Sequence, residues 1–133
     1  MTGERDRDAL LRQMEPELRP GIFVFCTIAA DETIPATVDP ILTFREQEGT
    51  TVVALLEHAE RSGLRYEFAS RLITLTVRSA LDAVGFLATI TARLAQEGIS
   101  VNAVSAFHHD HLFVPVDRAD EAIAVLREMS AAK

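Results

Sequence analysis

The 133-residue sequence contains one cysteine, no tryptophan, one tyrosine and no long hydrophobic run. A single cysteine excludes a disulfide framework within the chain. Its apolar stretches are too short to cross a bilayer, and the charged N-terminus lacks the pattern of a secretory signal. Cys26 lies in an apolar run and is expected to be an inert core thiol. We therefore expect a cytoplasmic protein with no membrane partner.

Positive charge is also scarce. Lys and Arg total 13 against 20 Asp and Glu, which gives a net charge of -7. Such an acidic chain gains little from phosphate backbones, so nucleic acid is not an expected partner. Hydrophobic residues make up 48% of the chain, enough to form a core and to exclude disorder as the main state. The length suits one domain, or two small units sharing a core.

Hydrophobic periodicity predicts the elements of the first half. In chain order these are a helix over 7–14, strands over 22–30, 41–47 and 50–55, a short helix over 57–62 and a strand over 64–69. The prolines and aspartates of 31–40 indicate a connecting loop, and Gly63 is typical of a helix C-cap. The spacing over 51–61 also fits a single helix, which is the alternative.

The second half gives a clearer pattern. It predicts a strand over 71–78, a helix over 82–97, strands over 99–107 and 111–116, and a last helix capped by Asp117. This order is a split βαβ arrangement, ferredoxin-like without its last strand, in which the strands over 71–78 and 111–116 are central neighbours.

The first half reads as the same unit with its first helix replaced by the loop over 31–40. The predicted fold class is therefore α+β, with two ferredoxin-like units. Each has an antiparallel sheet with helices on one face. Residues 1–69 would form a degenerate N-terminal unit with a leading helix, and residues 70–133 the C-terminal unit.

Several segments resemble the ACT domain family. The strand at 73–77 followed by the turn at 79–86 resembles the opening of an ACT domain, 95–102 its helix-to-second-strand junction, and 109–116 its third strand. With the upstream segment 43–49, the chain is similar to a small bacterial group of stand-alone ACT-like proteins. Related paired modules occur in aspartate kinases and cytosolic arginine sensors. The resemblance implies two ACT units, the first degenerate, that sense an amino acid or a similar small metabolite.

A ligand site is expected where the helix over 82–97 begins. A helix N-terminus offers unpaired N–H groups to a carboxylate, and a glycine there allows close approach. The resemblance implies an effector between two units, with an amide and a carboxylate facing it from the following strands. The candidate binding residues are Ser79, Asp82, Ala83, Val84, Gly85, Asn102 and Asp110. The alternative is that Ser79 and Asp82 only cap the helix and Gly85 only eases packing.

A second candidate site is the histidine cluster His108-His109-Asp110-His111. On an extended chain His109 and His111 share a side, so two imidazoles with a carboxylate could bind a transition metal. The alternative is a polar hairpin turn between two strands. Histidines in such a place could also confer pH sensitivity near neutrality.

The sequence has no nucleophile elbow, phosphate-cradling loop or dinucleotide fingerprint, so no enzymatic role and no cofactor are expected. The expected function is non-catalytic binding of an amino acid or similar metabolite at the interface of the ACT units. Unpaired strand edges favour a homodimer with joined sheets. The alternatives are a dimerising interaction scaffold without a ligand, and a metal-binding protein that uses His108–His111.

Overall fold

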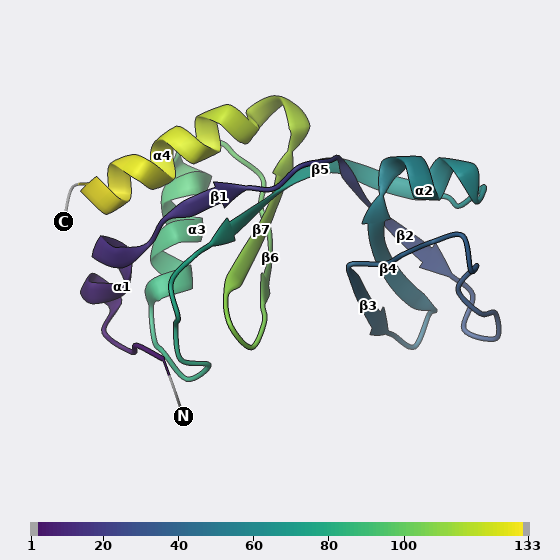
Figure 1. Ribbon diagram of the computed structural model, residues 1–133, viewed down its shortest axis with the longest axis horizontal. Helices are drawn as coiled ribbons and strands as arrows, with labels where there is room; N and C mark the ends of the chain where they lie inside the picture. The colour runs from purple at the N-terminus through teal and green to yellow at the C-terminus, as the bar shows by residue number, and fades with distance from the viewer. Residues whose placement is uncertain (1–2, 132–133) are drawn as a thin grey trace. The chain divides into compact units, whose positions relative to one another are not determined.

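The structure, a computed structural model, describes residues 3–131. The chain forms two compact units (Figure 1). Unit 1 comprises the described residues of Met1–Pro20 and Arg71–Lys133, and unit 2 comprises Gly21–Ser70. The sequence division placed residues 1–69 together, whereas the leading segment packs with the C-terminal half. The reason is that its apolar stripe, with Leu10 and Leu11, is buried in the core of unit 1.

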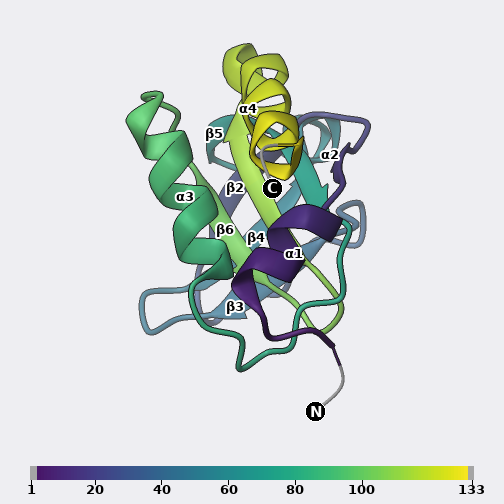
Figure 2. The ribbon, with the colours of Figure 1, turned by 90° about the vertical axis from the view of Figure 1, so that its left-hand side faces the viewer.

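Unit 1 contains α1 (Arg7–Gln13), β1 (Pro16–Leu18), the second half of β5 (Tyr66–Leu75), α3 (Phe86–Gln96), β6 (Asn102–Ser105), β7 (Asp110–Pro115), a 3-10 turn (Val116–Arg118) and α4 (Ala119–Ala131). β5 lies between β1 and β7, and β6 follows β7, which confirms β5 and β7 as central neighbours. The sequence pattern of this unit lacked the last strand of a ferredoxin-like fold. β1 takes the place of that strand, at the edge of the sheet beside β5. Helices α1, α3 and α4 lie together on one face of the sheet (Figure 2).

The core of unit 1 lies between these helices and the sheet. Its completely buried side chains come from every layer: Leu10, Ile73, Leu75, Ile90, Leu94, Leu112, Val114 and Leu126 are all 0% exposed. Burying one such side chain contributes roughly 1.5–3 kcal/mol. The register across the β6–β7 hairpin is also fixed, with Ser105 opposite Asp110.

Unit 2 contains β2 (Phe23–Ile28), β3 (Leu42–Arg45), β4 (Thr50–Leu55), α2 (Leu56–Arg61) and the first half of β5. Its antiparallel strands are ordered β3-β4-β2-β5. The first strand of this unit, β2, thus lies between its third strand, β4, and β5. In unit 1 the first strand, β5, likewise lies between the third strand, β7, and the edge strand β1, so both units are ferredoxin-like. No helix joins β2 to β3, as the loop over 31–40 predicted. The core of unit 2 includes Cys26, and burial raises the pKa of its thiol.

The predicted strands over 64–69 and 71–78 are one ten-residue strand, β5. Phe68 has a φ of 61°, and the β2–β5 register shifts between Phe23, which faces Ser70, and Phe25, which faces Glu67. This irregularity is a bulge, and a bulge displaces the alternation of side chains by one residue. The interrupted alternation made one strand look like two.

The prediction of a strand over 50–55 followed by a short helix is confirmed, and the alternative of a single helix over 51–61 is wrong, because Thr50–Leu55 is a strand that pairs with both β2 and β3. One further prediction is corrected. Asp117 does not cap the last helix, because it lies inside the 3-10 turn before α4. Within residues 3–131, no helix combines the length and the apolar character needed to cross a membrane.

Candidate functional site

The start of helix α3 differs from the prediction. The helix begins at Phe86 instead of Asp82, and its N-cap is Gly85 in the left-handed conformation, with φ 91°. Ser79 and Asp82 therefore lie in the preceding loop and do not cap it. A Cβ on Gly85 would lie 3.5 Å from the Cδ of Arg7, an ordinary contact. The positive φ is what favours glycine here, not a close approach of another group.

The N-terminus of α3 has no side-chain cap. The first N–H groups of a helix have no partner within the helix, and together they carry a partial positive charge. Asp, Asn, Ser or Thr at the N-cap usually satisfies one of them, but Gly85 has no side chain to do so. This end of the helix can therefore accept a carboxylate from outside.

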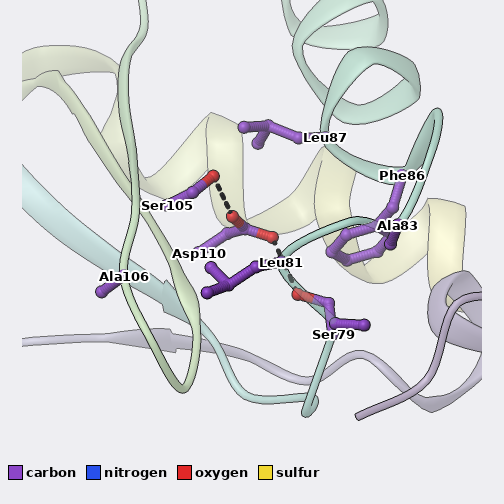
Figure 3. A pocket seen from close by; sticks show the side chains of 9 residues that line it. Ser79, Leu81, Ala83, Phe86, Leu87, Ser105, Ala106 and Asp110 are labelled. Atoms are coloured by element: carbon purple, nitrogen blue, oxygen red, sulfur yellow. Dashed lines mark hydrogen bonds between the residues drawn. The ribbon is translucent and has the colours of Figure 1, made fainter. Parts of the chain in front are cut away.

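A small cavity lies beside this helix end (Figure 3). Its volume is about 60 Å³, enough for a few water-sized groups. The lining comes from the loop before α3, the first turn of α3 and the β6–β7 hairpin. The lining residues are Ser79, Ala80, Leu81, Ala83, Phe86, Leu87, Ser105, Ala106 and Asp110.

The carboxylate of Asp110 is the charged group of this cavity, and the residue is only 6% exposed. Ser105 donates its hydroxyl to Oδ1 at 2.5 Å, and Ser79 donates its hydroxyl to Oδ2 at 3.3 Å (Figure 3). None of the nine lining residues is basic. The carboxylate therefore has no cationic partner among these residues, and it can accept a hydrogen bond from a cationic group that enters the cavity.

The structure brings together three of the seven candidate residues, Ser79, Ala83 and Asp110. The other four do not line the cavity. Gly85 starts the helix, and Val84 is 85% exposed. Asn102 lies three residues before Ser105 on β6, so its side chain points to the opposite face of the sheet.

Asp82, the remaining candidate, does not line the cavity, and its Oδ1 pairs with Nε of Arg5 at 2.9 Å. The hydrogen bond from Arg5 is the main cause that lowers the pKa of the Asp82 carboxyl. Because Asp82 is paired with Arg5, it does not compete with a ligand carboxylate for the N–H groups at the start of α3. Of the two aspartates, only Asp110 lines the cavity.

Sequence reasoning did not identify Ser105, Phe86 or Leu87 as lining residues. Ser105 carried a usable signal, because a hairpin that turns at 106–109 pairs it directly with Asp110. Phe86 and Leu87 could not be found while the helix was assumed to begin four residues earlier. Both lie in the first turn of α3, which begins directly after Gly85.

The histidine cluster does not form a metal site. Among residues 3–131, no group of three or more His, Cys, Asp or Glu side chains is placed to hold a metal ion. The rings of His109 and His111 lie 6.5 Å apart between centroids. Nδ1 of His109 lies 3.3 Å from the Val77 carbonyl oxygen, and Nδ1 of His111 lies 3.0 Å from Oγ1 of Thr74. The hairpin interpretation is confirmed, with Asp110 already in β7.

His111 is expected to make the stability of the protein depend on pH. Burial is the main cause that lowers its pKa below 6.5. His109 and Arg19 act in the same direction, and Asp110 opposes them. Because the unfolded chain then binds the proton more readily, stability is full above pH 6.5 and falls as the pH drops below it.

His111→Gln, which keeps a hydrogen-bonding group beside Thr74, should flatten the dependence of the unfolding free energy on pH between 5 and 7. Urea unfolding at several pH values measures this, with His58→Gln as the matched control. An unchanged slope in His111→Gln would contradict the assignment.

Comparison with known proteins agrees with this architecture. One ACT domain family model matches residues 2–71, and a second matches residues 67–128. No curated protein matches the chain.

Among solved structures, a Vibrio cholerae protein of unknown function, described as a possible transport protein, is 41% identical. The match covers 92% of this chain and 94% of that one, with a TM-score of 0.84. An Agobacterium tumefaciens protein is 21% identical over 88% and 89% of the two chains, with a TM-score of 0.76. The regulatory subunit of aspartate kinase from Thermus flavus is 11% identical over 86% and 96%, with a TM-score of 0.61. The chain belongs to the ACT domain family and carries two ACT units in tandem.

Proposed function

We propose that this chain is a non-catalytic regulatory protein whose cavity at Asp110 binds the zwitterionic head of a free amino acid or a similar small metabolite. The observation that carries the proposal is the pairing of two complementary groups at one cavity. A buried carboxylate lies on one side, and an uncapped helix N-terminus lies on the other.

The ligand amine is assigned to Asp110. A protonated amine can donate a hydrogen bond to this carboxylate, and such a charge-assisted hydrogen bond is about twice as strong as a neutral one. The hydroxyls of Ser79 and Ser105 already orient both carboxylate oxygens. The carboxylate therefore needs little reorganisation when an amine arrives, which favours binding.

The ligand carboxylate is assigned to the first turn of α3. Phe86 and Leu87 belong both to this turn and to the cavity wall. Backbone N–H groups and the helix dipole favour an anion there. The cavity of about 60 Å³ takes only the head of such a ligand, so the side chain would extend toward the exposed Leu81 at the mouth.

Thermal unfolding against each common amino acid tests the proposal. At a concentration of one hundred times Kd, a bound ligand stabilises the fold by about 2.7 kcal/mol. For a chain of this size that raises Tm on the order of ten degrees.

The matched control ligands are the N-acetyl and amide derivatives of the amino acid that gives the largest shift. Each derivative lacks one of the two charges, so neither should raise Tm. Equal stabilisation by either derivative would show that the two charges are not both recognised.

A second copy of the chain is the proposed protein partner. Within the described chain, β6 pairs with β7 and leaves its other side as a sheet edge. Open edges tend to pair, and like edges pair readily around a two-fold axis. Three exposed apolar residues, Leu81, Val84 and Phe107, lie on or next to the cavity-lining segments and would be covered. Light scattering should give twice the chain mass of 14.6 kDa.

The second candidate function is a dimerising scaffold without a ligand. The exposure of Val84 and Phe107, at 85% and 66%, favours it, because such side chains often mark a protein contact. A flat response to every amino acid at millimolar concentration, together with a stable dimer, would support the scaffold and reject the binding function.

A further inference from the structure

The N-terminal segment Gly3–Arg5, here called the clamp, runs beside the loop that lines the cavity. We propose that docking of the clamp is thermodynamically linked to occupancy of the cavity, so that this segment transmits the presence of the ligand. The inference rests on the proposed function and assigns how that same site is regulated. The three clamp residues themselves do not line the cavity.

The clamp is bound to the loop through its backbone. Glu4 forms a parallel β-bridge with Ser79. Its N–H donates to the carbonyl oxygen of Arg78 at 2.7 Å, and its carbonyl oxygen accepts from the N–H of Ala80 at 2.9 Å. These two hydrogen bonds enclose Ser79 from both sides. The clamp therefore fixes the backbone position from which the Ser79 hydroxyl reaches Asp110.

Two side-chain features adapt the sequence to this contact. Gly3 has a φ of 104°, and a Cβ built there would lie only 2.9 Å from the backbone nitrogen of Ala80. No residue with a side chain fits so close without moving the backbone. Next to it, Nε of Arg5 pairs with Oδ1 of Asp82 at 2.9 Å, which holds the far end of the loop.

The connection to the cavity is continuous. The clamp holds Ser79, Ser79 donates to one oxygen of Asp110, and Ser105 donates to the other. Undocking the clamp frees Ser79 and Ala80, which are both lining residues. A ligand that needs the ordered carboxylate binds the docked state more tightly, and by reciprocity its binding strengthens docking.

The clamp is also suited to undock without unfolding the unit. The Arg5–Asp82 pair is exposed, with 54% and 57% of the two side chains accessible, and exposed pairs are weak. The helix that follows is secured separately, because Asp6 caps α1 through the N–H of Asp8, and Leu10 and Leu11 are buried. Release of the clamp can therefore stop at Asp6, as a local opening of low cost.

Glu4→Pro tests the linkage, with Glu4→Ala as its matched control. Both variants lose the Glu4 carboxylate, which accepts from the N–H groups of Arg5 and Asp6. Only proline also removes the N–H that donates to Arg78. In the ligand-free protein, Glu4→Pro should lower the hydrogen-exchange protection of the Ala80 amide roughly tenfold relative to Glu4→Ala. Gly3→Ala, which displaces the same segment by sterics, should act like Glu4→Pro.

The second measurement follows Ser105 and Asp110, which line the cavity. The amide chemical shifts of Ser105 and Asp110 should change in Glu4→Pro and stay near wild-type values in Glu4→Ala. The amino acid that raises the wild-type Tm most should slow Ala80 exchange in the wild type and bind Glu4→Pro more weakly than Glu4→Ala.

If Ala80 loses protection while Ser105 and Asp110 remain unchanged, the clamp is only a tether and the inference is overturned. If no amino acid stabilises the wild type, the proposed function fails. The ligand-free comparison then still decides whether the clamp and the Asp110 carboxylate are coupled.

Discussion

Asp110→Asn should weaken binding of the stabilising amino acid roughly 10- to 100-fold, because a hydrogen bond to a charged group contributes about 1.5–3 kcal/mol. The substitution keeps the size of the side chain and an oxygen that can accept from a serine hydroxyl. It removes the negative charge that would hold the ligand amine. Isothermal titration calorimetry with the purified variant measures the change.

Asp120→Asn is the matched control for this prediction. Asp120 lies in the first turn of α4 and is exposed, so the same loss of one charge occurs far from the cavity. Its affinity should stay within twofold of wild type. If both variants bind alike, the amine does not sit on Asp110, and the charge of the cavity plays no part in recognition.

Leu10→Ala should lower the free energy of unfolding by about 2–5 kcal/mol, the range for removing a buried leucine side chain. Leu10 is 0% exposed and belongs to the core of unit 1, although it lies near the N-terminus. Tm should fall on the order of ten degrees. Urea unfolding measures the free energy, and hydrogen exchange shows which amides lose protection.

Leu81→Ala provides the comparison, because it removes the same atoms from a side chain that is 54% exposed. It should cost less than about 1 kcal/mol in the ligand-free protein. In Leu10→Ala, protection should fall more at Leu112 in unit 1 than at Val52 in unit 2, since the two residues belong to separate cores. Equal losses at both amides would refute the assignment of α1 to unit 1.

Local patterning was enough to predict most of the elements. The β-branched runs at 22–30 and 50–55, the glycine after the short helix, and the helical stripe of the C-terminal segment all led to elements that the structure contains. The split βαβ order predicted the pairing of the central strands, and the strand order of the sheet confirms it. The resemblance to ACT domains is confirmed by the family models. For the individual elements, the deciding contacts lie close together in the sequence or follow a regular period.

The candidate site was predicted only in part. Asp110, Ser79 and Ala83 were named, but Asp82 and Asn102 were placed wrongly. Asp82 was assumed to lie on the first turn of α3, and only the left-handed conformation of Gly85 shows that the helix begins later. Asn102 and Asp110 were both expected to face the ligand, whereas the hairpin register pairs Asp110 with Ser105.

Periodicity, composition and turn residues act over a few neighbours, and they were enough to predict the fold class and the two-unit plan. Asp110 was a candidate because the resemblance to ACT domains implied a carboxylate there. The unit to which residues 3–20 belong became clear only from the fold. β1 completes the sheet of unit 1, and the clamp reaches the loop at Ser79, across more than seventy residues of chain. Such contacts depend on which sheet edge is still unpaired and which apolar surface is still uncovered once the other elements have packed. A local sequence pattern contains no information about either.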